Sequence, residues 1–147
     1  MDPKTQEAYF QQFLTFITSV HEVTYDLTKD IKPDDITPVQ YSILEYIAVS
    51  QPVTLSQISE CKHISMPNTS RELKKLTEKN LCEKFDVAED RRKQFIRLSE
   101  AGQAMMNEAF QRIGSRFLSR LSDTSPEELE EINRALQLLQ SKVFYQE

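Results

Sequence analysis

The feature that most constrains this chain is a basic helical segment followed by two alternating stretches, all within residues 65–98. Ser65 precedes a run that predicts a helix over residues 66–79, and Asn80 stands where a left-handed residue commonly ends a helix. Apolar and polar residues alternate over residues 81–87 and again toward Leu98, on either side of a charged tip. The pattern predicts a short helix with a basic outer face, followed by a β-hairpin.

A second short helix is predicted immediately before this one. Thr54 and Gln57 have the spacing of a capping box, which predicts a helix over residues 55–62. Only three residues then separate it from the next helix, and two short helices joined by a tight turn are typical of a helix-turn-helix. With the hairpin added, the sequence predicts a winged helix-turn-helix.

Longer helices are predicted on both sides. Apolar residues recur at helical spacing over residues 3–29, and similar patterns or capping boxes predict helices over residues 38–49, 100–121 and 126–145. The fold class is therefore mainly α with a small β-hairpin wing. We expect a single domain over residues 1–147, with a winged DNA-binding lobe at about 37–98 and flanking dimerisation helices at about 3–30 and 100–147.

The helix over residues 66–79 has two distinct faces. The arc expected to face the core contains Met66, Thr69, Leu73, Leu76 and Asn80. The opposite arc contains Pro67, Asn68, Arg71, Lys74 and Lys75, with Ser70 at its flank. Arginine and asparagine can read guanine and adenine, whereas lysines more often hold phosphates. A solvated surface helix has the same pattern, and the acids Glu72 and Glu78 on or near the exposed arc are compatible with that alternative.

The charged tip favours nucleic acid over a plain surface. Polar residues are expected at any hairpin turn, but Arg91, Arg92 and Lys93 are more cations than a turn requires. An arginine is attracted into a narrow minor groove by its negative potential. Asp90 cannot bind phosphate directly, so we interpret it as a residue that orients an arginine.

The net charge of −5 at first opposes nucleic-acid binding, but the charges are unevenly distributed. Residues 54–98 contain ten Lys or Arg and seven Asp or Glu, a local balance of +3. The rest of the chain contains eight basic and sixteen acidic residues, a balance of −8. Screening makes the local field matter more than the total, so the basic segment can still bind phosphates.

Taken in order, these segments resemble the MarR family of bacterial transcription regulators. The matching stretches are residues 37–44, 54–58 and 65–81, and above all Asp90-Arg91-Arg92 followed by Ile96-Arg97-Leu98-Ser99. The resemblance covers nearly the whole chain. It departs from the family at Asn80, where members usually carry glycine.

The resemblance implies an obligate homodimer on a pseudo-palindromic double-stranded DNA operator, with Arg92 in the minor groove and Asp90 orienting it. It also implies a small aromatic or phenolic effector, for which Phe13, Phe16, Tyr41 and Tyr46 are candidates, although aromatics at helical spacing are more often core. The predicted DNA-binding residues are Ser65, Pro67, Asn68, Ser70, Arg71, Lys74, Lys75, Asp90, Arg91 and Arg92. The implied function is that of a repressor released by an effector.

Other classes of protein find less support. No nucleophile–base pair or phosphate loop indicates an enzyme, and neither the two histidines nor Cys61 and Cys82 form a ligand set, so no catalytic residue, cofactor or metal is expected. Cys61 is expected in the core, and buried thiols are usually inert. The N-terminus lacks a signal pattern and no apolar run reaches membrane length, which predicts a cytoplasmic protein. The main alternative is a winged-helix protein-interaction module that does not read DNA.

Overall fold

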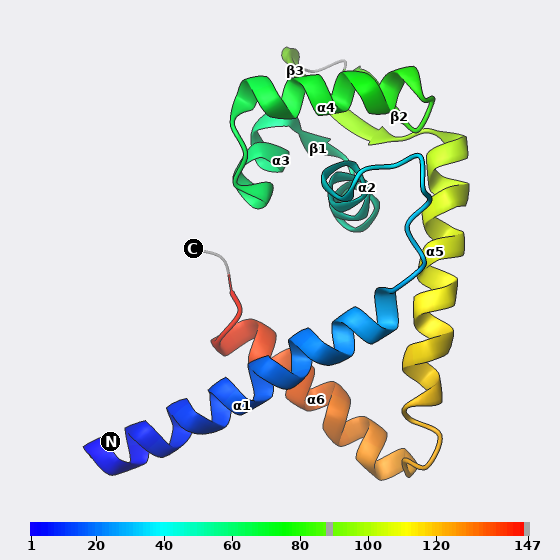
Figure 1. Ribbon diagram of the computed structural model, residues 1–147. Coiled ribbons are helices and arrows are strands. Elements are labelled where there is room, and N and C mark those ends of the chain that lie inside the picture. The colour runs from blue at the N-terminus through cyan, green and yellow to red at the C-terminus, as the bar shows by residue number, and fades with distance from the viewer. Residues whose placement is uncertain (88–89, 146–147) are drawn as a thin grey trace. The chain divides into compact units, whose positions relative to one another are not determined.

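The computed structural model describes residues 1–87 and 90–145, which form six helices and three strands (Figure 1). In chain order these are α1 Pro3–Thr28, α2 Pro38–Ser50, β1 Val53–Thr54, α3 Leu55–Lys62, α4 Met66–Glu78, β2 Cys82–Val87, β3 Asp90–Leu98, α5 Glu100–Ser119 and α6 Pro126–Lys142. The predicted fold class is confirmed. The last helix ends at Lys142, three residues before its predicted end.

The predicted capping boxes form and determine where the helices begin. At the start of α2 the Thr37 hydroxyl accepts the Gln40 N–H at 3.1 Å, and the Gln40 side chain accepts the Thr37 N–H at 3.2 Å. Equivalent reciprocal pairs begin α3 and α6. Ser65 caps α4 by accepting the Asn68 N–H at 3.2 Å. These bonds satisfy backbone donors that a helix leaves unpaired at its start.

Left-handed residues end the two short helices of the helix-turn-helix. His63 has φ 55° after α3, and Asn80 has φ 59° after α4, as predicted for Asn80. Behind Asn80, the Leu81 N–H donates to the Leu76 carbonyl at 2.9 Å, which closes the end of the helix in a Schellman pattern. Asparagine thus fills a position that favours glycine.

The three strands form one antiparallel sheet in the order β1-β3-β2. The predicted hairpin is present, with Cys82 opposite Leu98 and Phe85 opposite Phe95. The strand β1 was not predicted, because the residues between the helices expected over 38–49 and 55–62 were interpreted as a connection without a strand. That interpretation was wrong at Val53, which is buried and pairs with Ile96. Two residues are too few to show an alternating pattern. The partner strand β3 also lies far along the sequence, so local spacing does not reveal the pairing.

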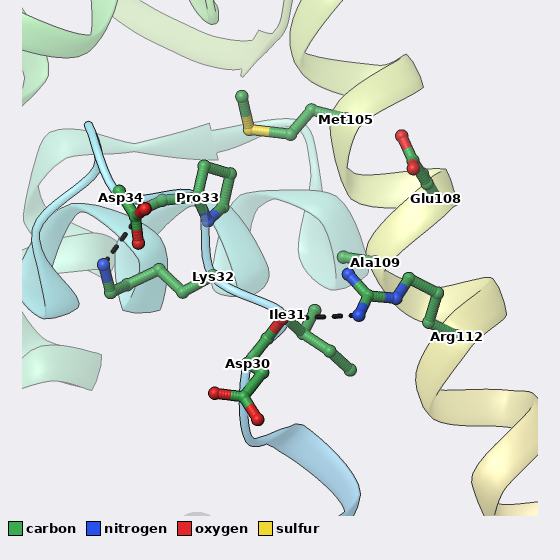
Figure 2. Close-up of a pocket in the computed structure, with 9 residues that line it drawn as sticks. All are labelled: Asp30, Ile31, Lys32, Pro33, Asp34, Met105, Glu108, Ala109 and Arg112. Carbon is green, nitrogen blue, oxygen red and sulfur yellow. Dashed lines mark hydrogen bonds between the residues drawn. The ribbon is translucent and has the colours of Figure 1, made fainter.

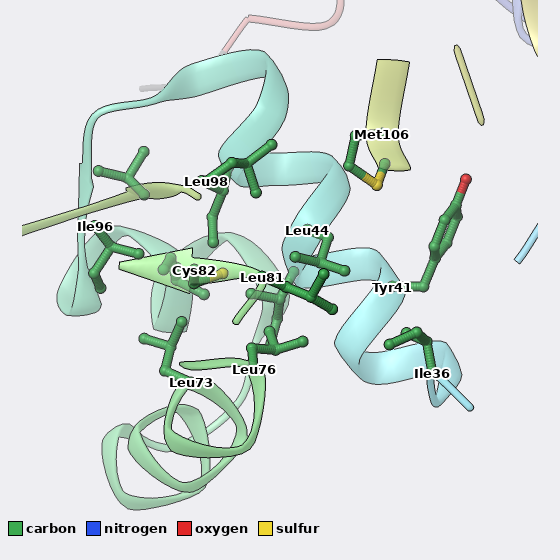
Figure 3. Packing of buried hydrophobic residues seen from close by; sticks show 14 of the residues in the cluster. Ile36, Tyr41, Leu44, Leu73, Leu76, Leu81, Cys82, Ile96, Leu98 and Met106 are labelled. Atoms are coloured by element: carbon green, nitrogen blue, oxygen red, sulfur yellow. The ribbon is translucent and has the colours of Figure 1, made fainter. Parts of the chain in front are cut away.

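One apolar core joins α2, α3, α4, the sheet and the first half of α5 (Figure 3). The core face of α4 consists of Thr69, Leu73 and Leu76, as predicted. The prediction is wrong for two residues of that face. Met66 is 44% exposed at the first position of α4, before the buried face begins, and Asn80 is exposed because it lies beyond the helix, where helical spacing no longer applies.

The chain divides into two compact units, Met1–Ile113 and Gly114–Glu147. Helix α5 begins in the first unit and ends in the second, and α6 belongs to the second. Neither α1 nor α6 contains a buried residue, although both carry large apolar side chains. None of the helices in the described residues combines the length and apolar composition that a membrane span requires.

Candidate nucleic-acid interface

Helix α4 turns one face to the core and the other to solvent. Burial of Leu73 and Leu76 orients the helix, because an apolar stripe on an amphipathic helix faces the core. The predicted DNA-binding residues of this segment are all exposed: Ser65, Pro67, Asn68, Ser70, Arg71, Lys74 and Lys75. They therefore form one polar surface with three cationic side chains.

Two of these residues contact each other. The Arg71 guanidinium donates to the Asn68 side-chain oxygen one helical turn earlier. The Asn68 backbone N–H donates to the Ser65 hydroxyl, so Asn68 contacts both the N-cap residue and Arg71. Arg71 is thus held at a defined point of the exposed face while its remaining N–H groups stay available as donors.

The wing, formed by β2, β3 and the tip between them, is braced at its base. Arg97 on β3 donates to the Glu83 carboxylate on β2 at 2.7 Å, and its guanidinium lies 4.3 Å from the centre of the Phe85 ring. Phe85 in turn lies 6.0 Å from the ring of Phe95. These cross-strand contacts align the two strands that carry the tip.

The predicted wing residues are placed only in part. The Arg92 side chain is exposed. Asp90 and Arg91 belong to β3, but their side chains, and the tip residues Ala88 and Glu89, lie outside the described residues. The orienting role predicted for Asp90 therefore remains a prediction.

Sequence reasoning missed two polar contacts that attach α4 to the preceding segment. The Gln40 amide donates to the Glu72 carboxylate at 3.1 Å, and the Lys79 ammonium donates to the Asp35 carbonyl at 2.9 Å. Glu72 also accepts from Lys75 at 3.4 Å. Both contacts join residues more than 30 positions apart, and local spacing carries no signal for such pairs.

A polar cavity of about 340 Å³ lies between the loop that follows α1 and helix α5 (Figure 2). The Arg112 side chain donates across it to the Asp30 carbonyl at 3.3 Å, while Lys32 turns back onto carbonyls of its own loop. The full lining consists of Asp30, Ile31, Lys32, Pro33, Asp34, Met105, Glu108, Ala109 and Arg112. Within the described residues, none of the four predicted aromatics lines this cavity.

Tyr41, one of those aromatics, is a core residue with an unusual hydroxyl. Its ring is buried, and within the described part of the chain its oxygen has no hydrogen-bond partner. Burial raises the pKa of the phenol, the negative charge of Glu45 raises it further, and the positive charge of Arg112 lowers it. The phenol is therefore within electrostatic range of a residue that lines the cavity.

The two cysteines are free and differ in exposure. Cys82 is buried in the sheet, and burial raises the pKa of its thiol to about 12. Cys61, expected in the core, is only partly buried. In the described residues no group of three or more His, Cys, Asp or Glu side chains is arranged to hold a metal ion.

Comparison with known proteins shows which family this geometry resembles. The model of the MarR family matches residues 36–93, which run from the start of α2 into the wing. The HTH-type transcriptional regulator TcaR of Staphylococcus aureus strain Newman is 24% identical over 135 residues, covering 90% of this chain and 89% of TcaR. Over the helix-turn-helix and into the wing, the chain is similar to the MarR family. These similarities support a DNA-binding transcription regulator of this kind.

Solved structures have the same fold as this chain. S. aureus MepR bound to ethidium bromide is 23% identical, with a TM-score of 0.64 over 88% of this chain and 94% of MepR. A MepR variant bound to an oligodeoxyribonucleotide, also 23% identical, has a TM-score of 0.57 over 90% of this chain and 97% of MepR. At this identity the likeness establishes the fold alone.

Proposed function

We propose that this chain is a homodimeric, sequence-specific regulator that represses transcription and is released by a small-molecule effector. The observation that carries the proposal is the exposed face of α4, where Arg71, Lys74 and Lys75 project beside a braced basic wing. A helix of this kind fits the major groove, and the wing then lies over the adjacent minor groove. MepR, which shares this fold, has been solved with DNA, and we extend that binding to this chain.

The exposed residues divide into two roles. Arg71, with Asn68 beside it, is assigned to base edges because its fork of N–H groups can donate to guanine O6 and N7. Lys74 and Lys75 are assigned to phosphates, which fix position without reading sequence. The remaining predicted residues are assigned to the ends of this surface: Ser65, Pro67 and Ser70 near the start of α4, and Asp90, Arg91 and Arg92 in the wing.

The dimer is proposed from two helices that contain no fully buried residue within their own chain. Helix α1 exposes Tyr9, Phe10 and Tyr25 by more than half, and α6 exposes Leu136 and Leu138 by more than half. Patches of this kind on a soluble protein mark interaction sites. We assign residues 3–30 and 100–147 to dimerisation and about 37–98 to DNA binding. A two-fold dimer then presents two copies of α4 to half-sites about 34 Å apart.

The effector is proposed to bind at the polar cavity beside the α1–α2 loop. The loop that lines the cavity also contains Asp35, whose carbonyl binds Lys79 at the end of α4. A ligand that moves this loop can therefore move the DNA-facing helix, which shifts the population between binding and non-binding forms. The Arg112 side chain and the unpaired Tyr41 hydroxyl within its electrostatic range favour a small aromatic compound with a polar substituent. MepR bound to ethidium offers a parallel in the same fold.

The experiment that tests the proposal is in vitro selection from random duplex DNA, with the enriched pool titrated at several salt concentrations. We expect a two-fold-symmetric motif with half-sites one helical turn apart and an affinity that falls steeply with salt. A transcription assay on a promoter containing that motif then tests repression. Selection that yields no motif at any salt concentration would overturn the proposal in favour of a protein-interaction module.

Two substitutions on α4 separate base recognition from phosphate binding. Arg71→Ala should cost about 1–3 kcal/mol at the selected site and relax the base preference at one position. Lys75→Ala should weaken binding to all duplexes alike and reduce the salt slope by about one. Equal affinity of both variants and the parent, measured by fluorescence anisotropy, would show that α4 does not face the DNA.

A further inference from the structure

Glu72 is an acid on the helix that otherwise presents cations to DNA. A carboxylate near phosphates normally weakens binding, because like charges repel. The side chain of Glu72 is only 22% exposed, whereas that of its neighbour Lys75 is 58% exposed. Glu72 is therefore turned toward the protein, and its contacts there indicate a positioning role rather than an electrostatic one.

The contacts of Glu72 connect α4 to the first turn of α2. One carboxylate oxygen accepts the Gln40 amide N–H at 3.1 Å, and the other lies 3.4 Å from the Lys75 ammonium. Gln40 is 4% exposed, and its own oxygen accepts the Thr37 backbone N–H at 3.2 Å. Both ends of this amide are used, so the capping box of α2 holds Gln40 in the orientation that Glu72 requires.

A second contact fixes the far end of the same helix. The Lys79 ammonium donates to the Asp35 carbonyl at 2.9 Å and lies 3.9 Å from the Asp35 carboxylate. Glu72 and Lys79 are seven residues apart, about two turns or 10 Å of helix. Apolar packing of Leu73 and Leu76 between them is not directional, whereas hydrogen bonds are. Burial of the apolar face therefore turns α4 broadly toward the core, and the two directional polar contacts fix its rotation more narrowly.

We propose that Glu72 is a positioning residue for DNA recognition, and that its bond to Gln40 sets the angle at which α4 presents Asn68 and Arg71 to the bases. The inference rests on the proposed function. It assigns to an acid a contribution to specificity, while the same acid opposes non-specific phosphate binding. The two effects have opposite signs and can be separated by measurement.

The readout is the specificity ratio, defined as the affinity for the selected site divided by that for a random duplex at the same salt. Glu72→Ala should lower this ratio about tenfold, the size expected for loss of a hydrogen bond to a charged group. Glu78→Ala is the matched control, because Glu78 is an exposed acid on α4 whose side chain has no hydrogen bond or ion pair among the described residues. It should strengthen binding to both duplexes and leave the ratio unchanged. A ratio that responds in the same way to both substitutions would overturn the proposal.

An exchanged pair provides the decisive variant. Gln40→Glu keeps the acceptor for the Thr37 N–H but removes the donor to Glu72 and places two carboxylates together, so the ratio should fall. Adding Glu72→Gln restores one donor and one acceptor in reversed order. This double variant has the same net charge as the parent, so the ratio should recover. Gln57→Glu makes the same change in the capping box of α3, away from Glu72, and should leave the ratio unchanged.

The outcomes separate this inference from the proposed function. A parent protein with a ratio near one would contradict sequence-specific binding itself, whatever Glu72 does. A parent with a high ratio and an exchanged pair no better than Gln40→Glu alone would leave the function intact and refute the positioning role. Thermal unfolding of each variant identifies any loss of fold, and the exchanged pair remains decisive if Glu72→Ala does not fold.

Discussion

The winged lobe and the outer helices differ in how far they bury apolar residues within the chain. In the lobe, short elements such as α3 and α4 bury their apolar faces within the chain, and core residues including Ile47, Ile58 and Leu76 are fully enclosed. Helices α1 and α6 are longer, yet neither contains a buried residue. The lobe is therefore complete as one chain, while the outer helices have apolar surface left for a partner.

The difference indicates where stability and function reside. A lobe with its own core can hold the exposed face of α4 in a fixed direction. Outer helices without fully buried residues gain stability by covering their apolar side chains, since exposed apolar surface is unfavourable in water. The predictions below test this contrast, beginning with the change that should cost the most.

The two glycines of the chain lie on α5, one at a packed position and one at an open position. A Cβ added at Gly102 would lie 2.0 Å from the backbone oxygen of Leu81, whereas a Cβ at Gly114 meets nothing within 4 Å. Gly102→Ala should therefore destabilise the fold by about 3 kcal/mol or more, because backbone cannot move aside as a side chain can. Gly114→Ala should stabilise the helix by about 0.5–1 kcal/mol.

Chemical denaturation of both variants checks this prediction. A similar small effect at both positions would contradict the close packing at the start of α5. A loss at Gly114 would instead place that open position in a contact with a second chain, which would extend the dimerisation surface along α5.

A charge on the exposed face of α6 tests the second half of the contrast. Leu136 is 53% exposed, so Leu136→Glu should be nearly neutral in a monomer. In the proposed dimer it should weaken association about 30-fold or more, because a charge is then buried without a partner. Analytical ultracentrifugation over a range of concentrations measures the change.

Gln137→Glu serves as the control, since it adds the same charge at the next position of α6 on a different side of the helix. Equal association constants for Leu136→Glu and the control would show that the Leu136 side of α6 does not form the interface. The remaining candidate would then be the exposed apolar face of α1.

Much of this fold could be predicted from sequence because its signals are local. Thr37, Thr54, Ser65 and Ser125 cap their helices as their spacing predicts, and Asn80 adopts the left-handed conformation expected at the end of α4. What could not be predicted depends on distant partners. Val53 forms a strand only through Ile96, and Met66 is exposed although its spacing matched the core face.

The candidate site shows the same limit. Helical spacing predicted that Arg71, Lys74 and Lys75 are exposed, because the buried residues of α4 fix the opposite face. It did not predict that Glu72 is held by Gln40, since a hydrogen bond across 32 positions leaves no periodic pattern. The cavity itself was not predicted, because its lining combines residues of the loop after α1 with residues of α5 that are distant in sequence.

The smallest predicted effect concerns a carboxylate in the lobe. Burial raises the pKa of Glu45, and the positive charge of Lys62 partly opposes this shift. The folded state therefore binds the Glu45 proton more tightly than the unfolded chain does. This contribution to stability is fully present below the unfolded pKa of about 4.3 and is lost as the pH rises through the folded value.

Glu45→Gln removes the ionisable group and should make the protein slightly more stable than the parent at pH 7, with a difference that shrinks as the pH falls toward about 4. Glu130→Gln, on the exposed helix α6, controls for the loss of one negative charge. Urea denaturation across this pH range provides the comparison. An equal response of the two variants would show that the packing of the lobe does not desolvate Glu45, and the contrast between the two regions would then rest on apolar burial alone.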